Sequence, residues 1–376
     1  MAMAEVNVAA LPGLALVGAG IFARAQYIPH LRNMKDVVSL RAIWSRSQDS
    51  VQSTAKLVHD FAPEVEIKWG ADGLREILKN ESIHSVAIVL AGQAQSFFCK
   101  TQLEIVHQAL KAGKHVLQEK PIGPNVAEVR NAISLYRTLH ATGGQAPIWA
   151  LAENYRFEPG LLKASDLVRD LGDMMAVEVI VELPMEESNP YFSSSWRRDS
   201  SFPGGFMLDG GVHFTAGLRL ITGSEVKSVM AIARHVDASL PPPDNVSALL
   251  QLENECAGVM VMSYSSRTRK VSWRVVGSRG TVEVERGINN GQHGYTVTHC
   301  PAKGSPQADF FPFAGVQEEL KSFVKDVAKV VFEGKSSTEA DQCSSVVEAF
   351  RDVAVIEAML ISSQTKGGAV QVEHHT

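Results

Sequence analysis

Short apolar runs alternate with amphipathic stretches through the first third of the chain. Continuous apolar runs predict strands at residues 14–17, 37–44, 67–69, 85–90 and 115–118. Between the runs, apolar residues recur at helical spacing, as Phe22, Ala25, Ile28 and Leu31 do after the first one. Regular alternation of strand and helix is typical of a doubly wound parallel α/β sheet.

The pattern changes after about residue 150, where predicted strands follow one another without a helix between them. Helices are expected near residues 158–171, 208–222, 315–333 and 341–362. Strands are expected at residues 174–183, 226–236, 245–253, 257–265, 270–277, 280–286 and 294–300. Successive strands joined by short glycine- or asparagine-containing turns favour a mostly antiparallel sheet. We therefore expect two domains, a parallel-sheet domain over residues 1–145 and an α+β domain with a large open sheet over residues 146–376.

Composition and charge narrow the class of protein. Of the 376 residues, 45% are hydrophobic, which is too many for a disordered chain. The net charge of −5 does not indicate the basic surface that would bind nucleic acid or an anionic membrane. No run approaches the roughly 18 apolar residues of a membrane helix, and the start lacks a signal-peptide pattern, so we expect a cytoplasmic protein. The four cysteines lie far apart, so neither a metal site nor a disulfide framework is expected.

A glycine-rich motif follows the first predicted strand. Residues 18–23 read Gly-Ala-Gly-Ile-Phe-Ala, which matches the pattern G-x-G-x-x-G/A, and they open the first predicted helix. In a dinucleotide site, Gly18 would make a tight turn, Gly20 would let the backbone approach a pyrophosphate, and Ala23 would let the helix pack on the sheet. Glycine-rich turns also occur without a ligand, but the order of strand, motif and helix favours a dinucleotide site.

The end of the second predicted strand indicates which cofactor binds. Sites that prefer NAD usually carry an acidic residue there, which binds the ribose 2′-hydroxyl. Here the chain has Ser45, Arg46 and Ser47, with no carboxylate before Asp49. A guanidinium with two hydroxyls suits a 2′-phosphate, so NADP(H) is predicted in preference to NAD(H). The alternative is that Arg46 is a solvated loop charge.

Two further motifs carry candidate chemistry. Glu119-Lys120-Pro121 ends the last predicted strand of the parallel sheet, and ligands of such sheets bind at the carboxyl ends of the strands. Lys120 is therefore expected to point toward the nicotinamide. Asp209 and His213 lie four residues apart at the start of a predicted helix, so both side chains can approach one ligand.

Together these motifs resemble the Gfo/Idh/MocA family of NAD(P)-dependent oxidoreductases. The resemblance extends over nearly the whole chain and rests on residues 18–23, 119–121, 153–157 with Pro159, 171–172 and 209–213. The stretches 150–156, 195–197 and 208–213 are most similar to a eukaryotic branch that includes fungal and plant NADP(H)-dependent proteins. The resemblance implies an N-terminal Rossmann domain, a C-terminal α+β domain and a homodimer formed through the C-terminal sheet.

The resemblance also implies roles for individual residues. Lys120 is similar to the family lysine that binds the reacting oxygen, and the Lys120–Pro121 bond is a candidate for the cis form. Asp209 and His213 match the pair that shares proton transfer with that lysine. An imidazole titrates near neutrality, and a lysine does so when its pKa is lowered, so either Lys120 or His213 is a candidate proton carrier. The expected cofactor-binding residues are Gly18, Gly20, Ile21, Phe22, Ser45, Arg46, Ser47, Leu90, Ala91, Gln95, Glu119 and Lys120.

One segment departs from the family pattern. Family members commonly have Thr-Pro-Asn or Thr-Pro-x-x-His after the fourth main strand, whereas this chain has Leu90-Ala91-Gly-Gln-Ala-Gln95. Contact between this backbone and the cofactor is still expected. The missing histidine weakens any transfer of substrate identity from sugar dehydrogenases.

Candidate substrate-binding residues come mainly from the second domain. Tyr155, Arg156, Trp196 and Arg197 combine stacking surface with fork-shaped donors, which suits a polyhydroxylated or anionic small molecule. Lys120 and His213 complete the predicted substrate set. The alternatives are that the two aromatic residues belong to the core or an interface, and that Arg156 is a partner in an internal salt bridge.

The leading hypothesis is an NADP(H)-dependent oxidoreductase that moves a hydride to or from a carbonyl or alcohol carbon of a small polar metabolite. One alternative is a nucleotide-sensing regulatory protein without turnover, although such a protein would be free to lose Lys120, Asp209 or His213. Another is a redox-neutral, NAD-dependent glycosidase, as found among relatives of the family. The sequence leaves the substrate and the direction of reaction open.

Overall fold

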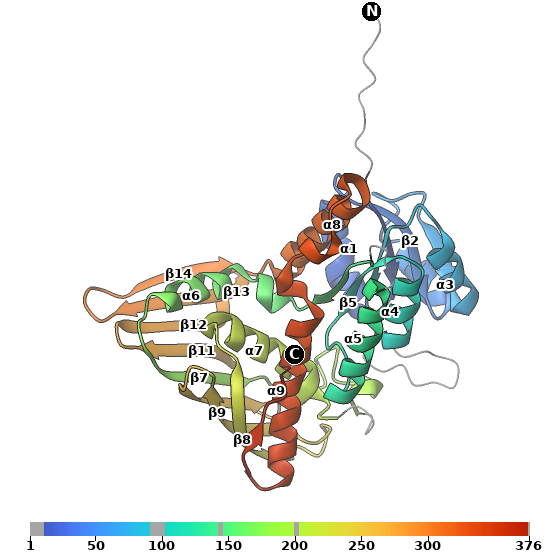
Figure 1. The fold of residues 1–376 in the computed structure, drawn as a ribbon. Coiled ribbons are helices and arrows are strands. Elements are labelled where there is room, and N and C mark those ends of the chain that lie inside the picture. The colour runs from blue at the N-terminus through green and yellow to red at the C-terminus, as the bar shows by residue number, and fades with distance from the viewer. Residues whose placement is uncertain (1–10, 91–101, 142–145, 199–202, 375–376) are drawn as a thin grey trace, which may run out of the picture.

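The computed structural model describes residues 11–90, 102–141, 146–198 and 203–374. Ala91 and Gln95, which the sequence assigns to the cofactor site, lie outside these ranges. Two sheets of different architecture lie side by side in the molecule (Figure 1). The prediction of one parallel and one mostly antiparallel sheet is thereby confirmed.

The first sheet has six strands, all parallel, in the order β3-β2-β1-β4-β5-β6. Its strands are β1 (Gly13–Val17), β2 (Ser39–Ser45), β3 (Glu66–Trp69), β4 (Ser85–Ile88), β5 (His115–Glu119) and β6 (Trp149–Ala152). The connecting helices are the π-helix η1 (Ala23–Tyr27) with α1 (Ile28–Asn33), α2 (Gln48–Ala55), α3 (Gly70–Lys79), α4 (Gln102–Lys111) and α5 (Val126–Ala141). The strand order reverses between β1 and β4, which is where such sheets bind dinucleotides.

The second sheet has nine strands in the order β14-β13-β12-β11-β7-β10-β9-β8-β15. Its strands are β7 (Met174–Glu182), β8 (Val226–Arg234), β9 (Asn245–Leu252), β10 (Ala257–Ser263), β11 (Lys270–Gly277), β12 (Gly280–Asn289), β13 (Gln292–Pro301), β14 (Gln307–Pro312) and β15 (Val370–Gln371). The pair β7–β10 is parallel and the other pairs are antiparallel. The edge strands β14 and β15 were not predicted, because β14 has no alternating apolar pattern and β15 is only two residues long.

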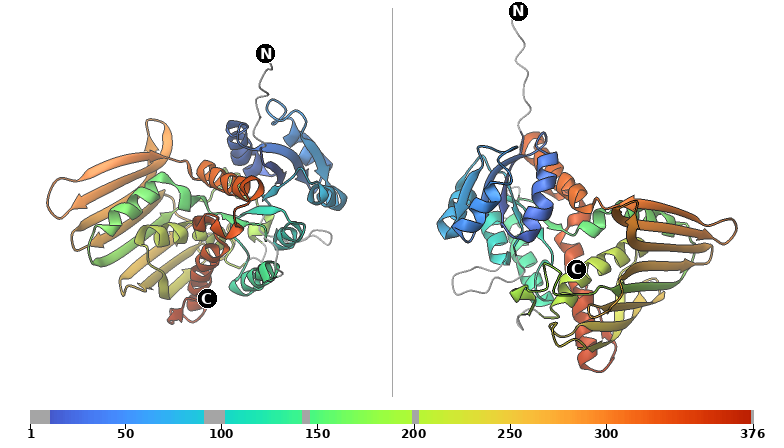
Figure 2. Two further views of the ribbon diagram at one scale, coloured as in Figure 1. Left: turned by 45° about the horizontal axis from the view of Figure 1, so that its top comes forward. Right: turned by 180° about the vertical axis from the view of Figure 1, so that it is seen from behind.

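Three helices cover one face of the nine-stranded sheet. They are α6 (Pro159–Arg169), α7 (Phe206–Thr222) and α9 (Val346–Gln364). Figure 2 shows these helices on the same side of the sheet. Short 3-10 turns complete the fold at η2 (Asn154–Phe157), η3 (Ser195–Arg198), η4 (Ser337–Glu339) and η5 (Gln342–Ser344).

The helix α8 (Gly315–Glu333) returns from the second half of the chain to the parallel sheet, where it lies beside α1 (Figure 1). Leu320, Phe323 and Val327 of α8 are buried in one core with Leu16 and Leu31. Strand β6 also belongs to the parallel sheet, although it follows residue 145. The domain boundary at 145/146 stays a prediction, and the parallel sheet with its covering helix extends beyond it.

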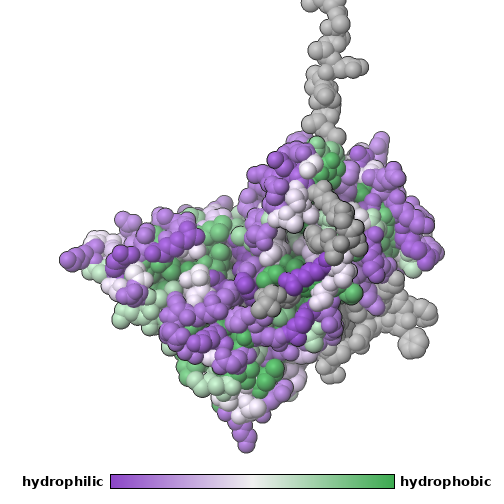
Figure 3. Space-filling model, viewed as in Figure 1, coloured by the Kyte–Doolittle hydropathy of each residue, from purple (hydrophilic) through white to green (hydrophobic). Residues whose placement is uncertain are grey.

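Polar side chains dominate the face of the molecule shown in Figure 3, and apolar side chains lie among them in small groups. The larger apolar residues are concentrated in two buried cores, one on each side of the parallel sheet. The core that does not contain the α8 residues continues into the antiparallel domain. In the described ranges, no helix is both long and apolar enough to cross a membrane.

Candidate active site

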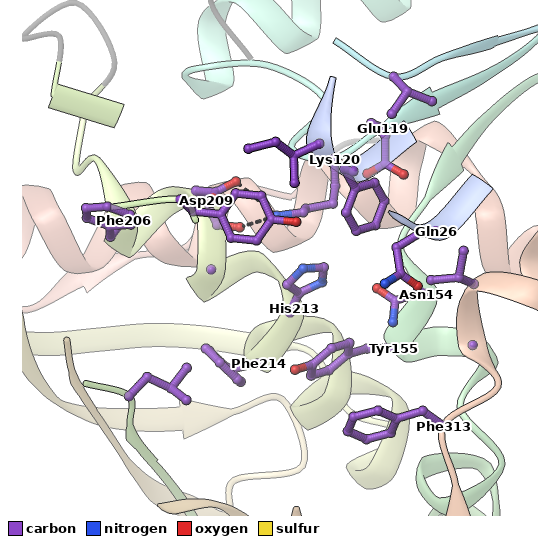
Figure 4. Close-up of a pocket in the computed structure, with 18 of the residues that line it drawn as sticks. Gln26, Glu119, Lys120, Asn154, Tyr155, Phe206, Asp209, His213, Phe214 and Phe313 are labelled. Atoms are coloured by element: carbon purple, nitrogen blue, oxygen red, sulfur yellow. Dashed lines mark hydrogen bonds and ion pairs between the residues drawn. The ribbon is translucent and has the colours of Figure 1, made fainter. Parts of the chain in front are cut away.

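A cavity of about 680 Å³ lies between the two domains at the carboxyl ends of the parallel strands. The glycine turn, the end of β5, the turn η2 and the helix α7 all contribute to its walls. Figure 4 shows the side chains that point into it: Lys120 and Asp209 meet at one end, Phe313 lies at the other, and His213 and Tyr155 lie between them in this view. The arrangement joins the nucleotide-binding edge of one domain to the helical face of the other.

The glycine turn has the shape that a bound phosphate requires. Gly18 has φ +132°, and a Cβ there would lie 2.1 Å from the carbonyl oxygen of Val89, so the turn needs glycine. A Cβ on Gly20 would meet no atom within 4 Å, which leaves open space against the backbone at the cavity wall. Helical residues begin at Ile21, so free N–H groups of the helix start face this space. Ile21 and Phe22 line the same wall.

The end of β2 presents a serine and a basic residue. Ser45 is buried at the last position of the strand, whereas Arg46 and Ser47 are exposed in front of α2. The first carboxylate after the strand is that of Asp49, in the first turn of α2. Leu90 follows β4 and lines the cavity. The donors at this edge are a guanidinium and hydroxyls rather than a carboxylate.

Lys120 follows β5 and reaches across the cavity to α7. Its Nζ donates to Oδ1 of Asp209 at 2.9 Å and to the backbone carbonyl of Asp209 at 2.8 Å. The Lys120–Pro121 peptide bond is cis, as the resemblance implies. The loop end of the parallel sheet is thereby tied to the first turn of α7, 89 positions further along the chain.

Asp209 is shared between two cations. Arg197 donates from Nε to Oδ2 of Asp209 at 2.7 Å, on the side away from Lys120. Burial alone would raise the pKa of Asp209, but the charges of Lys120 and Arg197 and their hydrogen bonds hold it well below its usual range. Asp209 is therefore ionised at neutral pH and pairs with both cations.

His213 has a different carboxylate partner. Its Nδ1 lies 2.6 Å from Oε1 of Glu153, and its ring stacks on that of Tyr155 with a centroid distance of 4.6 Å and an interplanar angle of 16°. Burial would raise the pKa of Glu153, but the neighbouring His213, Lys120 and Arg156 lower it below its ordinary value. An ionised Glu153 accepts Nδ1–H and leaves Nε2 as the nitrogen that can exchange a proton with a ligand.

Glu153 was not predicted as a site residue. It appeared in the sequence only as the first residue of the 153–157 motif, and its pairing with His213 spans 60 positions. No local pattern could have found it, because the contact arises where η2 packs against α7.

A second buried carboxylate, Glu119, lies behind Lys120 at the cavity wall. It accepts a hydrogen bond from the hydroxyl of Tyr27 at 2.7 Å. Glu319 of α8 is also buried in this region, and its Oε2 has no hydrogen-bond partner among the described residues. Burial, together with the charges of neighbouring glutamates, raises the pKa of both Glu119 and Glu319 above the ordinary value.

Two predicted substrate residues, Tyr155 and Arg156, are adjacent in η2, but their side chains point to different regions. Tyr155 lines the cavity, where its ring contacts His213. Arg156 does not line it: its Nη2 lies 2.7 Å from Oδ2 of Asp352, and its Nη1 lies 3.3 Å from Glu348. The expectation that Arg156 binds substrate is therefore corrected to the alternative, an internal salt bridge, because successive residues of a 3-10 turn leave it in different directions.

Of the remaining predicted substrate residues, Arg197 lines the cavity through its pairing with Asp209. Trp196 belongs to the turn η3, but its side chain lies outside the described part of the structure. The cavity has aromatic and basic residues that the sequence did not single out: Tyr191, Phe206, Tyr264, Arg286, Tyr295 and Phe313. Within the described ranges, no three His, Cys, Asp or Glu side chains form a cluster suited to a metal ion.

Two family models match the chain. The model described as an oxidoreductase family with an NAD-binding Rossmann fold matches residues 13–143. The model described as the Gfo/Idh/MocA C-terminal domain matches residues 162–283. The chain belongs to the Gfo/Idh/MocA oxidoreductase family. It is thus an NAD(P)-binding oxidoreductase with the domain pair typical of that family.

Relatives of the family are similar over nearly the full length of the chain. Dehydrogenase FPY6 of Fusarium mangiferae is 29% identical over 370 residues, covering 94% of this chain and 97% of that protein. The uncharacterized protein YMR315W of Saccharomyces cerevisiae is 27% identical, covering 95% and 97%. Both are fungal, in agreement with the eukaryotic branch that the sequence resembles. Among solved structures, an oxidoreductase from Thermotoga maritima is 26% identical with a TM-score of 0.78, covering 96% of this chain and 98% of that one.

Proposed function

We propose that this Gfo/Idh/MocA protein is an NADP(H)-dependent oxidoreductase that transfers a hydride to or from a carbonyl or alcohol carbon. The substrate is a small polar metabolite, resembling a sugar, a polyol or an aldehyde. The observation that carries the proposal is the Lys120 amine, held 2.9 Å from the Asp209 carboxylate in the cavity that also contains His213 and the glycine turn. The amine of Lys120, the imidazole of His213 and the glycine turn thus face the same cavity.

The chain's own residues would bind and orient both reactants. The turn at Gly20 and the hydroxyls and guanidinium at residues 45–47 would hold the phosphates of the cofactor. The bound nicotinamide supplies or accepts the hydride. Lys120 would donate a hydrogen bond to the reacting oxygen, in a position fixed by Asp209.

The proton that accompanies hydride transfer needs a carrier at the same oxygen. His213 is one candidate, because Glu153 engages its Nδ1 and leaves Nε2 for the substrate. Lys120 is the other candidate, because its amine reaches the same part of the cavity. Asp209, held in its ionised form by two cations, would act on the amine and not on the substrate proton.

The preference for NADP(H) is tested at Arg46. Replacing Arg46 by alanine removes the guanidinium that would bind the 2′-phosphate, so the Kd for NADPH should rise about tenfold or more while the Kd for NADH stays unchanged. Fluorescence titration with both cofactors measures the two constants. Arg41→Ala, at an exposed arginine within the preceding strand β2, is the matched control and should leave both constants unchanged. Unaltered NADPH binding by Arg46→Ala would contradict the proposed cofactor preference.

Turnover is tested by following absorbance at 340 nm with NADP+ or NADPH and a panel of sugars, polyols and aldehydes. A steady gain or loss of absorbance with one substrate class supports net oxidoreduction. A protein that binds NADPH tightly but turns over no member of the panel would instead favour the sensor hypothesis. Product formation without change at 340 nm would favour a redox-neutral cycle.

We also propose that the protein forms a homodimer through the uncovered face of the nine-stranded sheet. Met230 and Ile232 of β8, Leu249 of β9 and Val259 of β10 expose between 36% and 55% of their surface on neighbouring strands. Exposed apolar residues at alternate positions are typical of a sheet face that packs against another surface.

A further inference from the structure

The end of the cavity opposite Lys120 has a cation without an anionic partner. Arg286 of β12 lines the cavity, and its guanidinium lies 4.9 Å from the centroid of the Phe313 ring. It forms no ion pair with any described residue, in contrast to Arg197, Arg156 and Arg219. Its one hydrogen bond is a long one of 3.4 Å, from Nη1 to the hydroxyl oxygen of Tyr155.

Two phenol groups lie beside this guanidinium. The Tyr155 hydroxyl accepts from Arg286, so its own O–H is available as a donor. The hydroxyl of Tyr295 lies close to that of Tyr155, and Tyr295 is only 1% exposed. By its geometry the Tyr295 hydroxyl forms no hydrogen bond with a described residue. Leaving a buried hydroxyl without a partner is costly, so a group that accepts its proton would be favoured here.

The carboxylate of Glu158 lies in the same region as Arg286. Glu158 is buried close enough to interact with it electrostatically, but the two form no ion pair. The oxygens of Glu158 accept hydrogen bonds instead, Oε2 from the backbone N–H of Ala314 at 3.1 Å and Oε1 from the Asn154 amide at 3.4 Å. The guanidinium of Arg286 is therefore not engaged in an ion pair with any described residue, and the donors around Glu158 are the groups that satisfy its oxygens.

We propose that Arg286, with the hydroxyls of Tyr155 and Tyr295, binds an anionic group of the substrate. A fork-shaped cation and two O–H donors match the oxygens of a carboxylate or of a phosphate monoester. The inference rests on the proposed function and narrows its substrate class: the metabolite carries an anion at the end remote from the reacting carbon.

The geometry sets the distance between the two ends of such a substrate. The Tyr155 ring stacks on His213, while its hydroxyl contacts Arg286. The anion would thus lie about one aromatic ring beyond the imidazole, with the reacting carbon near His213 and Lys120. A sugar acid, a sugar phosphate or an aldehyde acid of several carbons spans that separation, whereas a simple short aldehyde does not.

The test first measures NADPH binding by fluorescence, and then titrates D-gluconate, D-glucose 6-phosphate and D-glucose into the protein saturated with NADP+. Wild-type protein should bind at least one of the two anions about tenfold or more tightly than glucose, as expected for a hydrogen-bonded charge pair. Arg286→Gln should remove that preference, and Tyr295→Phe should reduce it by a few-fold. The tighter of the two anions identifies the class of group that is bound.

Arg274→Gln is the matched control, because Arg274 is exposed on the neighbouring strand β11 and does not line the cavity. It should retain the anion preference of the wild type. Equal binding of the three probes, binding of none of them, or a preference that survives in Arg286→Gln would overturn the anion site. A higher Kd for NADPH in Arg286→Gln would also overturn the anion site, because Arg286 would then contact the cofactor. Absence of NADPH binding in the wild type would instead refute the proposed function itself.

Discussion

Two clusters of buried charge lie near the turn η2. One joins Lys120, Arg197 and Asp209 at the cavity, with ion pairs of 2.9 and 2.7 Å. The other lies beneath η2, where Arg156 and Arg219 meet Asp352 at 2.7 Å. Both are built from ion pairs of similar length between segments distant in sequence, so bond length alone does not tell them apart.

The two clusters differ in how their charged side chains are paired and in where they lie relative to the cavity. In the network beneath η2, the three arginines 156, 219 and 351 pair with three carboxylates, those of Glu225, Glu348 and Asp352. At the cavity, the two cations Lys120 and Arg197 share the single carboxylate of Asp209. The first cluster joins α7, α9 and η2 through these pairs, whereas the second lies in the cavity that also contains His213 and the glycine turn.

The comparison shows what distinguishes a structural ion network from a reactive one. In a network of paired buried charges, removing one member leaves an uncompensated buried charge. A lysine that lines the cavity beside the nucleotide-binding turn can donate to an oxygen that becomes negative during reaction. Substitutions in the first cluster should therefore change stability, and substitutions in the second should change turnover.

The largest expected effect is on turnover, at Lys120. Lys120→Met removes the amine that we propose donates to the reacting oxygen, so kcat should fall about 10²- to 10⁴-fold. Steady-state kinetics at 340 nm measures the loss, and Lys111→Met, at an exposed lysine of α4, should retain full activity.

The same assay over a range of pH separates the roles of the neighbours of Lys120. If His213 carries the proton, His213→Ala should lose both rate and the pH dependence of kcat. Asp209→Asn should lose rate and keep that dependence, because the aspartate is ionised throughout the neutral range. A Lys120→Met variant with wild-type kcat would show that the two clusters do not differ in function.

The next effect is on stability, at Arg156. Arg156→Met leaves Asp352 with one arginine fewer in a buried position, so the free energy of unfolding should fall by about 3–5 kcal/mol. Urea denaturation followed by circular dichroism measures the change. Arg169→Met, which removes an exposed pair with Asp166, should change it by about 0.5 kcal/mol or less. Unchanged stability with a raised substrate KM would restore Arg156 as a substrate residue.

The smallest expected effect concerns the pH dependence of stability, at Glu319. Burial raises the pKa of Glu319 in the folded state above its value in the unfolded chain. The contribution of Glu319 to stability is therefore fully present at a pH below the unfolded-state pKa. That contribution is lost as the pH rises through the folded-state pKa. Glu319→Gln removes this loss, so the free energy of unfolding at pH 8 should rise by about 1–3 kcal/mol while that at pH 4 changes little.

Thermal unfolding at pH 4, 6 and 8 follows this effect. Glu318→Gln, at a half-exposed neighbour paired with Lys321, should reproduce the pH dependence of the wild type. A Glu319→Gln variant that is less stable than the wild type at pH 8 would show that the carboxylate is ionised and has a partner.

The sequence placed the nucleotide-binding turn and the pair Lys120 and Asp209 in advance, for identifiable reasons. The turn is a local pattern of glycines between a strand and a helix, and Lys120 ends a strand at the edge where such sheets bind ligands. Asp209 and His213 were grouped by their helical spacing and by resemblance to the family. The sequence could not show that Tyr155 faces the cavity and Arg156 does not. The direction of each side chain in a turn depends on how the turn packs against the rest of the protein.

The chain's own pattern of apolar and polar residues determined most of the strands and helices, the two sheet types and the glycine turn, because each depends on residues close together in sequence. Only the tertiary structure decided that Glu153 pairs with His213, that Arg286 packs on Phe313 at the far end of the cavity, and that α8 returns to cover the parallel sheet. These features depend on side chains brought together from segments tens to hundreds of residues apart, where no local spacing carries the information.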